Sequence, residues 1–193
     1  MKSKKQFLLI AGAVLILLSV GFFIIQNFYA GRTSQNATII ATEIGKMIPN
    51  RSTGVEESYT NTQMPALQFE GNDYVCLLEV PSDSVCLPVQ NDWNTKALMY
   101  APCRFWGSSY DGSLILGGSG SKGQFDFCGL LEIGDQVMIT DMEGTLFTYT
   151  VEHIDRSKTA QFEKLSDPSY SLTLFVQEAY STSYIVVRCN MAM

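Results

Sequence analysis

The feature that most constrains the fold is a succession of short apolar segments between Asp73 and Cys189. Each segment has the alternation or the short apolar run of a β-strand, and turn-forming residues separate the segments. They are YVCLLEV (74–80), SVCLPV (84–89), SLILGG (113–118), QVMITDMEGTLFTYTVEHI (136–154), SLTLFV (171–176) and SYIVVRC (183–189). Seven or more short strands predict a mainly β fold, a closed or nearly closed barrel of about 120 residues.

Short helices and a linker complete the expected organisation. Residues 125–135 and 159–167 are candidates for short helices between strands, and the strand pair in 136–154 is expected to turn at Glu143–Gly144. Apolar residues at helical spacing between 36 and 48 predict an amphipathic helix or stalk. Residues 49–72 are polar and rich in turn-forming residues, which is typical of a linker.

The N-terminus carries an uncharged apolar run, FLLIAGAVLILLSVGFFII, from Phe7 to Ile25. As a helix it would be roughly 28 Å long at ~1.5 Å per residue, close to the ~30 Å hydrocarbon core of a bilayer. A cleaved signal peptide is the rival interpretation, but its apolar region is typically ~7–15 residues long. The best cleavage site, before Gly31, also has Phe28 where a small residue is needed. We therefore predict a retained signal-anchor.

Orientation and charge follow from the same region. Lysines precede the span and are absent just after it, which places the N-terminus in the cytoplasm and the remainder outside the cell membrane. The expected parts are a cytoplasmic tip and anchor (1–30), a stalk or linker (31–72) and a β-barrel domain (73–193). From Gly31 onward the chain has 10 Lys and Arg and 19 Asp and Glu, a net charge of 10 − 19 = −9. An acidic surface without a basic stripe argues against nucleic acid as a partner.

Five cysteines lie in the exported part: Cys76, Cys86, Cys103, Cys128 and Cys189. None of them has Cys-x-x-Cys spacing and the chain has one histidine, so we expect no metal site and no cofactor. Disulfides are possible outside the cytoplasm, but an odd number leaves at least one thiol free or paired between molecules. Because most of them lie in apolar segments, we expect buried free thiols that act as small hydrophobic side chains.

Six segments resemble sortases in order and spacing: CLLEVPSDSVCLPV, APCRFWGS, LILGG, FCGLLEIGDQV, LTLF and VVRC. The resemblance extends from Tyr74 to Cys189. Within the sortases, the sequence resembles the class B-like branch that is common in Gram-positive clostridia. Sortases are membrane-anchored β-barrel transpeptidases that cut a sorting signal and join the protein to peptidoglycan or to a pilin. The resemblance therefore implies a sortase-like barrel at the cell surface, with sorting-signal peptides, surface proteins, pilins or an active sortase as partners.

The resemblance also implies three catalytic residues that this sequence lacks. In the family a cysteine attacks the scissile carbonyl, a histidine acts as acid and base, and an arginine stabilises the oxyanion. Aligned without gaps, Gln177 occupies the cysteine position, Gly118 the histidine position and Tyr184 the arginine position. A glutamine amide cannot form an acyl-enzyme, glycine has no side chain to move a proton, and tyrosine is neutral below pH ~10.

Other residues do not supply the missing chemistry. Cys189 and Cys128 have no histidine at a matching position, and the lone His153 is interpreted as an ordinary histidine at a strand end. Arg188 matches the arginine of the family's VRC ending and not the catalytic one. Residues 181–183 (Ser181, Thr182 and Ser183) have no evident base beside them and are interpreted as loop residues.

These observations predict a catalytically inactive pseudosortase that binds or scaffolds a partner. Its groove is expected around Gly117, Ser119 and Ser183, next to the glycine- and serine-rich loop that runs to Gly123. Two alternatives remain open, because a fold does not fix a function. One is an active transpeptidase or hydrolase of the cysteine type with relocated catalytic residues, and the other is a purely structural envelope protein.

Overall fold

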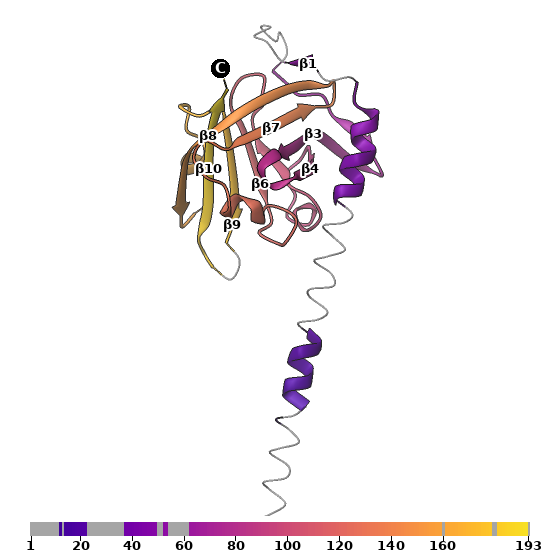
Figure 1. The fold of residues 1–193 in the computed structure, drawn as a ribbon, viewed down its shortest axis with the longest axis vertical. Helices are drawn as coiled ribbons and strands as arrows, with labels where there is room; N and C mark the ends of the chain where they lie inside the picture. The colour runs from indigo at the N-terminus through magenta and orange to yellow at the C-terminus, as the bar shows by residue number, and fades with distance from the viewer. Residues whose placement is uncertain are drawn as a thin grey trace, which may run out of the picture.

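The computed structural model describes residues 12, 14–22, 37–49, 52–53, 62–159, 161–178 and 181–192 (Figure 1). Its strands are β1 (Ser52–Thr53), β2 (Leu67–Phe69), β3 (Asn72–Val80), β4 (Val85–Gln90), β5 (Cys103–Trp106), β6 (Leu114–Gly118), β7 (Gln136–Asp141), β8 (Thr145–Ser157), β9 (Leu172–Gln177) and β10 (Tyr184–Met191). Its short helices are η1 (Pro81–Asp83), η2 (Ala97–Met99), η3 (Asp126–Gly129) and α2 (Phe162–Leu165). Residues 14–22 and 37–47 are also helical.

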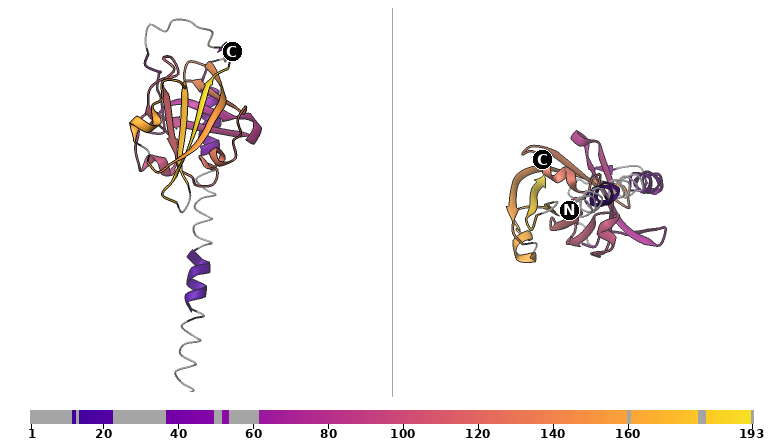
Figure 2. Two further views of the ribbon diagram at one scale, coloured as in Figure 1. Left: turned by 90° about the vertical axis from the view of Figure 1, so that its left-hand side faces the viewer. Right: turned by 90° about the horizontal axis from the view of Figure 1, so that it is seen from below.

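Eight strands, β3 to β10, close into a mixed barrel (Figures 1 and 2). The order around the barrel is β8-β10-β9-β6-β5-β4-β3-β7, and β7 pairs with β8 to close it. The β4–β5 and β6–β9 pairs are parallel, and the other pairs in the barrel are antiparallel. The expectation of a mainly β, closed barrel is confirmed.

Alternating residues of β9 and β10 face two different apolar clusters. Leu172, Leu174 and Val176 of β9 are buried in the core inside the barrel, together with alternate residues of β10. Phe175, the residue between two of them, packs on the opposite face with Ile115, Leu165 and Val186, which we call the outer cluster. This alternation is what a strand buried on both faces requires.

The predicted strands between 74 and 189 are present, and the hairpin turns where expected. Asp141 holds this turn, because its Oδ1 accepts hydrogen bonds from the backbone N–H of Glu143 (2.9 Å) and of Thr145 (2.8 Å). Gly144 has φ +88°, a left-handed conformation that favours glycine. Strands β2 and β5 were not predicted, and of the helix expected over 125–135 only the short η3 forms.

Part of the segment expected to be a linker belongs to the barrel structure. Strand β2 pairs with β3 through Leu67 and Tyr74, and Met64 is buried in the core with 3% of its surface exposed. The helix over 37–47 packs on the barrel through Ala41 and Ile44, which contact an apolar cluster that includes Leu77. The amphipathic character predicted for this helix therefore serves packing against β3 (Figure 1).

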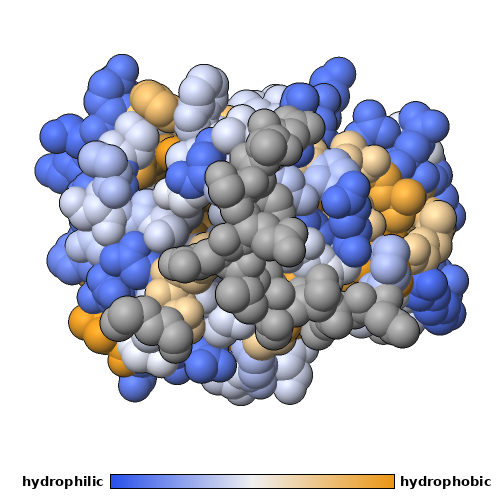
Figure 3. All heavy atoms as spheres, turned by 90° about the horizontal axis from the view of Figure 1, so that it is seen from above, coloured by the Kyte–Doolittle hydropathy of each residue, from blue (hydrophilic) through white to orange (hydrophobic). Residues whose placement is uncertain are grey.

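Part of the expected membrane anchor, Phe7 to Ile25, lies outside the described residues, which cover 12 and 14–22 of it. These residues are helical, and large apolar side chains among them are exposed, Leu17 to 71%. Within the described part of the chain, no helix is both long enough and apolar enough to cross a membrane. Figure 3 views the barrel from the end opposite this segment, where the described surface is mostly hydrophilic and hydrophobic residues form small separate areas.

Candidate functional site

The three expected catalytic positions lie at one end of three neighbouring strands. Gly118 ends β6, Gln177 ends β9 and Tyr184 begins β10. In the sheet Gly118 is opposite Val176, and Gln177 is the direct partner of Tyr184. The backbone therefore brings together positions that are far apart in the sequence, although their family roles stay predictions.

The side-chain directions at these three positions differ. Gln177 follows Val176 and so points to the face opposite the core, where Tyr184 packs beside the outer cluster. A Cβ added at Gly118 would lie 2.2 Å from Cγ of Phe125, a fully buried ring of the core. Parallel pairing explains this direction, because it gives Gly118 the same facing as Val176. A side chain at 118 would therefore point away from Gln177.

Backbone and amide hydrogen bonds hold the end of β9 in place. The exposed Gln177 donates from Nε2 to the carbonyl oxygen of Ser181 at 3.1 Å. The backbone N–H of Glu178 donates to the carbonyl oxygen of Ser183 at 2.9 Å, and the Glu178 carboxylate accepts from Nε of Arg156 at 2.9 Å. The residues described in this connection offer an amide and hydroxyl groups that bind polar groups, but no thiol.

An aromatic cluster covers Gly117, the first of the expected groove residues. The rings of Trp93 and Phe175 stack with centroids 5.5 Å apart, and Phe105 contacts both edge-on at 5.0 and 5.3 Å. A Cβ added at Gly117 would lie 2.5 Å from an atom of each of Trp93 and Phe175. Glycine therefore allows these rings to lie directly on β6.

The other two groove residues lie in the loops at this end of the barrel. The Ser119 hydroxyl is 2.8 Å from the Ser121 hydroxyl, and its carbonyl accepts from the backbone N–H of Phe125 at 3.0 Å. Ser183 donates its backbone N–H to the Ser181 hydroxyl at 3.0 Å. These bonds order the loops on both sides of Gln177.

All five cysteines are free, and none lies at the end of β9. Four are buried and Cys86 is half-buried. Burial raises the pKa of Cys189 to about 12 and raises the pKa of Cys76, Cys103 and Cys128 as well. A thiol needs a lowered pKa to be a nucleophile near neutral pH, so these thiols are suited to packing and not to catalysis.

His153 and Arg188 take part in a surface network of β8, β10 and α2. Arg188 donates to Asp155 at 2.7 Å and to the carbonyl oxygen of Lys164 at 3.0 Å, with 11% of its side chain exposed. The His153 ring nitrogen Nε2 is 3.7 Å from the same Asp155 carboxylate. Arg188 therefore fastens α2 to the sheet. Among the described residues there is no group of three His, Cys, Asp or Glu side chains that could hold a metal ion.

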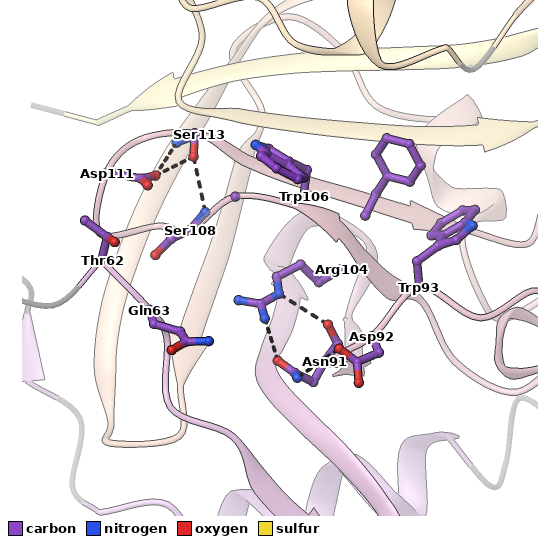
Figure 4. Close-up of a pocket in the computed structure, with 12 residues that line it drawn as sticks. Thr62, Gln63, Asn91, Asp92, Trp93, Arg104, Trp106, Ser108, Asp111 and Ser113 are labelled. Atoms are coloured by element: carbon purple, nitrogen blue, oxygen red, sulfur yellow. Dashed lines mark hydrogen bonds between the residues drawn. The ribbon is translucent and has the colours of Figure 1, made fainter.

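Two pockets that the sequence did not indicate meet at Trp106. One, of about 520 Å³, lies between residues 62–63, the segment after β4 and the segment after β5 (Figure 4). The other, of about 380 Å³, lies between the start of β6 and residues 165–170. Asp111 and Ser113 line both pockets as well. The sequence places Trp106 in the segment APCRFWGS that resembles sortases, but its exposure of 58% depends on the fold.

No family model matches this chain, and no curated protein matches it. Several solved structures do match it, and all of those named here are sortases. Sortase A of Listeria monocytogenes is 21% identical, with a TM-score of 0.55 over 62% of this chain and 88% of that chain. Sortase A of Corynebacterium diphtheriae is 16% identical, with a TM-score of 0.55 over 85% and 84%. Sortase C1 of Streptococcus agalactiae is 21% identical, with a TM-score of 0.55 over 66% and 71%. The chain thus has a sortase-like fold, similar to structures of classes A and C, and the expected class B-like assignment stays a prediction.

Proposed function

We propose that this protein is a membrane-anchored, cell-surface pseudosortase of the class B-like branch, which binds or scaffolds a partner without turning it over. The partner is a sorting-signal peptide, the surface protein or pilin that carries one, or an active sortase. The sortase-like fold supports the kinship with sortases. The residues at the strand ends support the loss of catalysis.

One observation carries the proposal. The ends of β6, β9 and β10 lie side by side, and the described residues there include Gln177 and Tyr184 but no thiol. A transpeptidase needs a covalent acyl intermediate, which requires a nucleophile at this place. An amide cannot form an acyl intermediate, and a neutral phenol is a poor nucleophile without a base to activate it.

A groove for an extended peptide is supported by the pocket of about 380 Å³ beside the outer cluster. Apolar and aromatic side chains line one part of it, among them Ile115, Leu165 and Tyr170, and polar side chains, among them Asp167 and Thr173, line the rest. Such a pocket suits an apolar side chain of a peptide that runs along β6 and β9 toward Gln177.

The anchor at residues 7–25 would hold the barrel at the outer surface of the cell membrane. Support comes from the uncharged apolar run, the lysines before it and the exposed apolar side chains at 14–22. In this position the barrel would face newly exported chains that carry sorting signals.

The test is a calorimetric titration of the full-length protein in detergent with sorting-signal peptides and with scrambled peptides of the same composition. We expect binding of a sorting-signal peptide without any cleaved or transferred product. Gln177→Ala and Tyr184→Ala should weaken this binding, each by about tenfold, because both side chains face the proposed groove. Tyr100→Ala is the control, since Tyr100 is 63% exposed and lines neither of the two pockets that meet at Trp106.

Two results would contradict the proposal. Release of a cleaved peptide would favour the alternative of an enzyme with relocated residues. Equal affinity for scrambled and sorting-signal peptides, or no binding by protein with an intact circular dichroism spectrum, would favour a structural envelope role.

A further inference from the structure

We propose that the pocket drawn in Figure 4 binds a neutral glycan, a chain of pyranose sugars without charged groups. This inference does not rest on the function proposed above, although Trp106, Asp111 and Ser113 also line the pocket given there to a peptide. The pocket is about 520 Å³, within the ~300–1,000 Å³ of typical ligand sites. Strands β4 and β5 pair only at Gln90 and Cys103, so the chain that follows each strand diverges and lines a concave surface.

Both tryptophans of the chain line this pocket. Trp106 is 58% exposed and Trp93 is 38% exposed. An indole ring combines a large apolar face with one N–H donor, so it suits a ligand that is apolar on one side and wet on the other. The face of a pyranose ring, with its C–H groups on one side and its hydroxyls at the rim, is such a ligand.

Beside the aromatic rings, hydrogen bonds hold the polar side chains of Arg104, Asn91 and Asp92 in place. Arg104 donates from Nε to the carbonyl oxygen of Asn91 at 3.2 Å and from Nη2 to the Asn91 Oδ1 at 2.7 Å. Asn91 in turn donates to the Asp92 carboxylate at 3.2 Å. Figure 4 shows the Arg104 guanidinium between this pair and Gln63, with Trp106 above it. A guanidinium has five N–H donors, and these two bonds use two of them.

The rim opposite Asn91 is also preorganised. Gly107 has φ +73°, and a Cβ there would overlap the Ser113 carbonyl, so only glycine permits this tight turn. Ser108 and Ser113 bond each other through the backbone, at 3.1 Å, and the Asp111 carboxylate accepts from the Ser113 hydroxyl. The rim thus presents the Asp111 carboxylate and the Ser113 hydroxyl in fixed positions.

Charge decides between the classes of ligand. The pocket has one cation, Arg104, and two carboxylates, Asp92 and Asp111, which gives a net charge of 1 − 2 = −1. Phosphate or an acidic glycan would meet two like charges. Sugar hydroxyls both donate and accept, so a neutral glycan can use the guanidinium and both carboxylates.

The test uses the two tryptophans as reporters. The full-length protein, in a detergent without a sugar headgroup, is titrated with cellotetraose and with the β-1,4-linked N-acetylglucosamine tetramer, and the tryptophan emission is followed. We expect a saturable change with at least one of them. Trp106→Ala should weaken binding by about tenfold or more, Trp106→Tyr by less, and Asp92→Ala by several-fold. Because Trp106→Ala removes one reporter, calorimetry measures the affinity of each variant.

Tyr100→Ala is the matched control, because it removes an exposed aromatic ring outside the pocket and should leave binding unchanged. A heparin tetrasaccharide and an extended peptide that could pair with the edge of β5 are the competing ligands. The proposal is overturned if neither neutral tetramer binds at millimolar concentration or if Trp106→Ala binds as the unmodified protein does. Tighter binding of either competing ligand at this pocket overturns it as well.

Discussion

At the scale of single residues, Gly117 and Gly118 decide what lies on the two faces of β6. A Cβ at Gly117 would lie 2.5 Å from both Trp93 and Phe175, so Gly117→Ala must displace rings. We expect the free energy of unfolding to fall by about 1–3 kcal/mol, the usual cost of overpacking, in urea denaturation followed by tryptophan fluorescence. Gly45→Ala is the control. Its Cβ would meet Leu77 at an ordinary 3.7 Å in a helix, so it should be neutral or stabilise by up to about 1 kcal/mol.

The second prediction concerns the buried thiols, which should make the protein less stable at high pH. Burial raises the pKa of Cys189 from 9.0 to about 12, so the folded chain keeps a proton that the unfolded chain loses in this interval. The contribution of the protonated Cys189 thiol to the free energy of unfolding is fully present below pH ~9. It is lost between pH ~9 and pH ~12, at up to about 1.4 kcal/mol per pH unit. Cys76, Cys128 and Tyr149 act in the same direction.

The measurement is the urea midpoint between pH 8 and 11. Cys189→Ala should be less stable than the unmodified protein at pH 8, because it leaves a gap in the core. The difference in stability between the two proteins should narrow as the pH rises, because the variant lacks a thiol whose ionisation favours the unfolded chain. An equal decline in both proteins would show that Cys189 does not contribute.

The neighbourhood of Gln177 and Tyr184 was predictable from the sequence, because the strand pattern of LTLFVQ and the family spacing place both at the β9–β10 connection. The direction in which a side chain at position 118 would point was not predictable, because it depends on the register of β6 beside β9. The aromatic cluster was not predictable either, since it joins Trp93 and Phe105 from loops and strands with no local signal.

At the scale of the elements, α2 has only four residues and depends on its contacts with the sheet. Arg188 bonds both the Lys164 carbonyl and Asp155, so Arg188→Ala should cost about 1–3 kcal/mol and loosen α2. Hydrogen exchange of the α2 amides and a urea titration measure this. Arg156→Ala is the control, because its partner is Glu178 but its side chain is 71% exposed, and its cost should be below about 1 kcal/mol. Equal costs would contradict the anchoring role of Arg188.

Strands with clear alternation were predictable, and strands that rest on tertiary pairing were not. β2 has only three residues and exists through its pairing with β3. β5 follows Pro102, contains a charged Arg104 and has a bulge before Trp106, which hides its alternation. Local patterns show neither the partner strand nor a bulge.

At the scale of the whole molecule, the helix over 37–47 is part of the folded barrel domain. Ile44 is fully buried against the barrel, whereas Met47 on the same helix is 53% exposed. Ile44→Ala should therefore lower the free energy of unfolding by about 2–5 kcal/mol, and Met47→Ala should change it by less than about 0.5 kcal/mol. Thermal and urea unfolding measure both. If Ile44→Ala and Met47→Ala both had small effects, the helix would be a separate stalk, one of the two possibilities that the sequence suggests.

The central claim, a sortase-like barrel without turnover, is tested most directly by intact mass spectrometry of the full-length protein incubated with a sorting-signal peptide. Gln177→Cys places an exposed thiol at the position that the family uses, and it should be alkylated much faster than the buried native thiols. The account predicts no covalent acyl adduct on the unmodified protein and little turnover by Gln177→Cys, because the family's histidine and arginine positions hold Gly118 and Tyr184. A covalent acyl adduct on the unmodified protein would contradict the account, and mapping it would identify the catalytic residue.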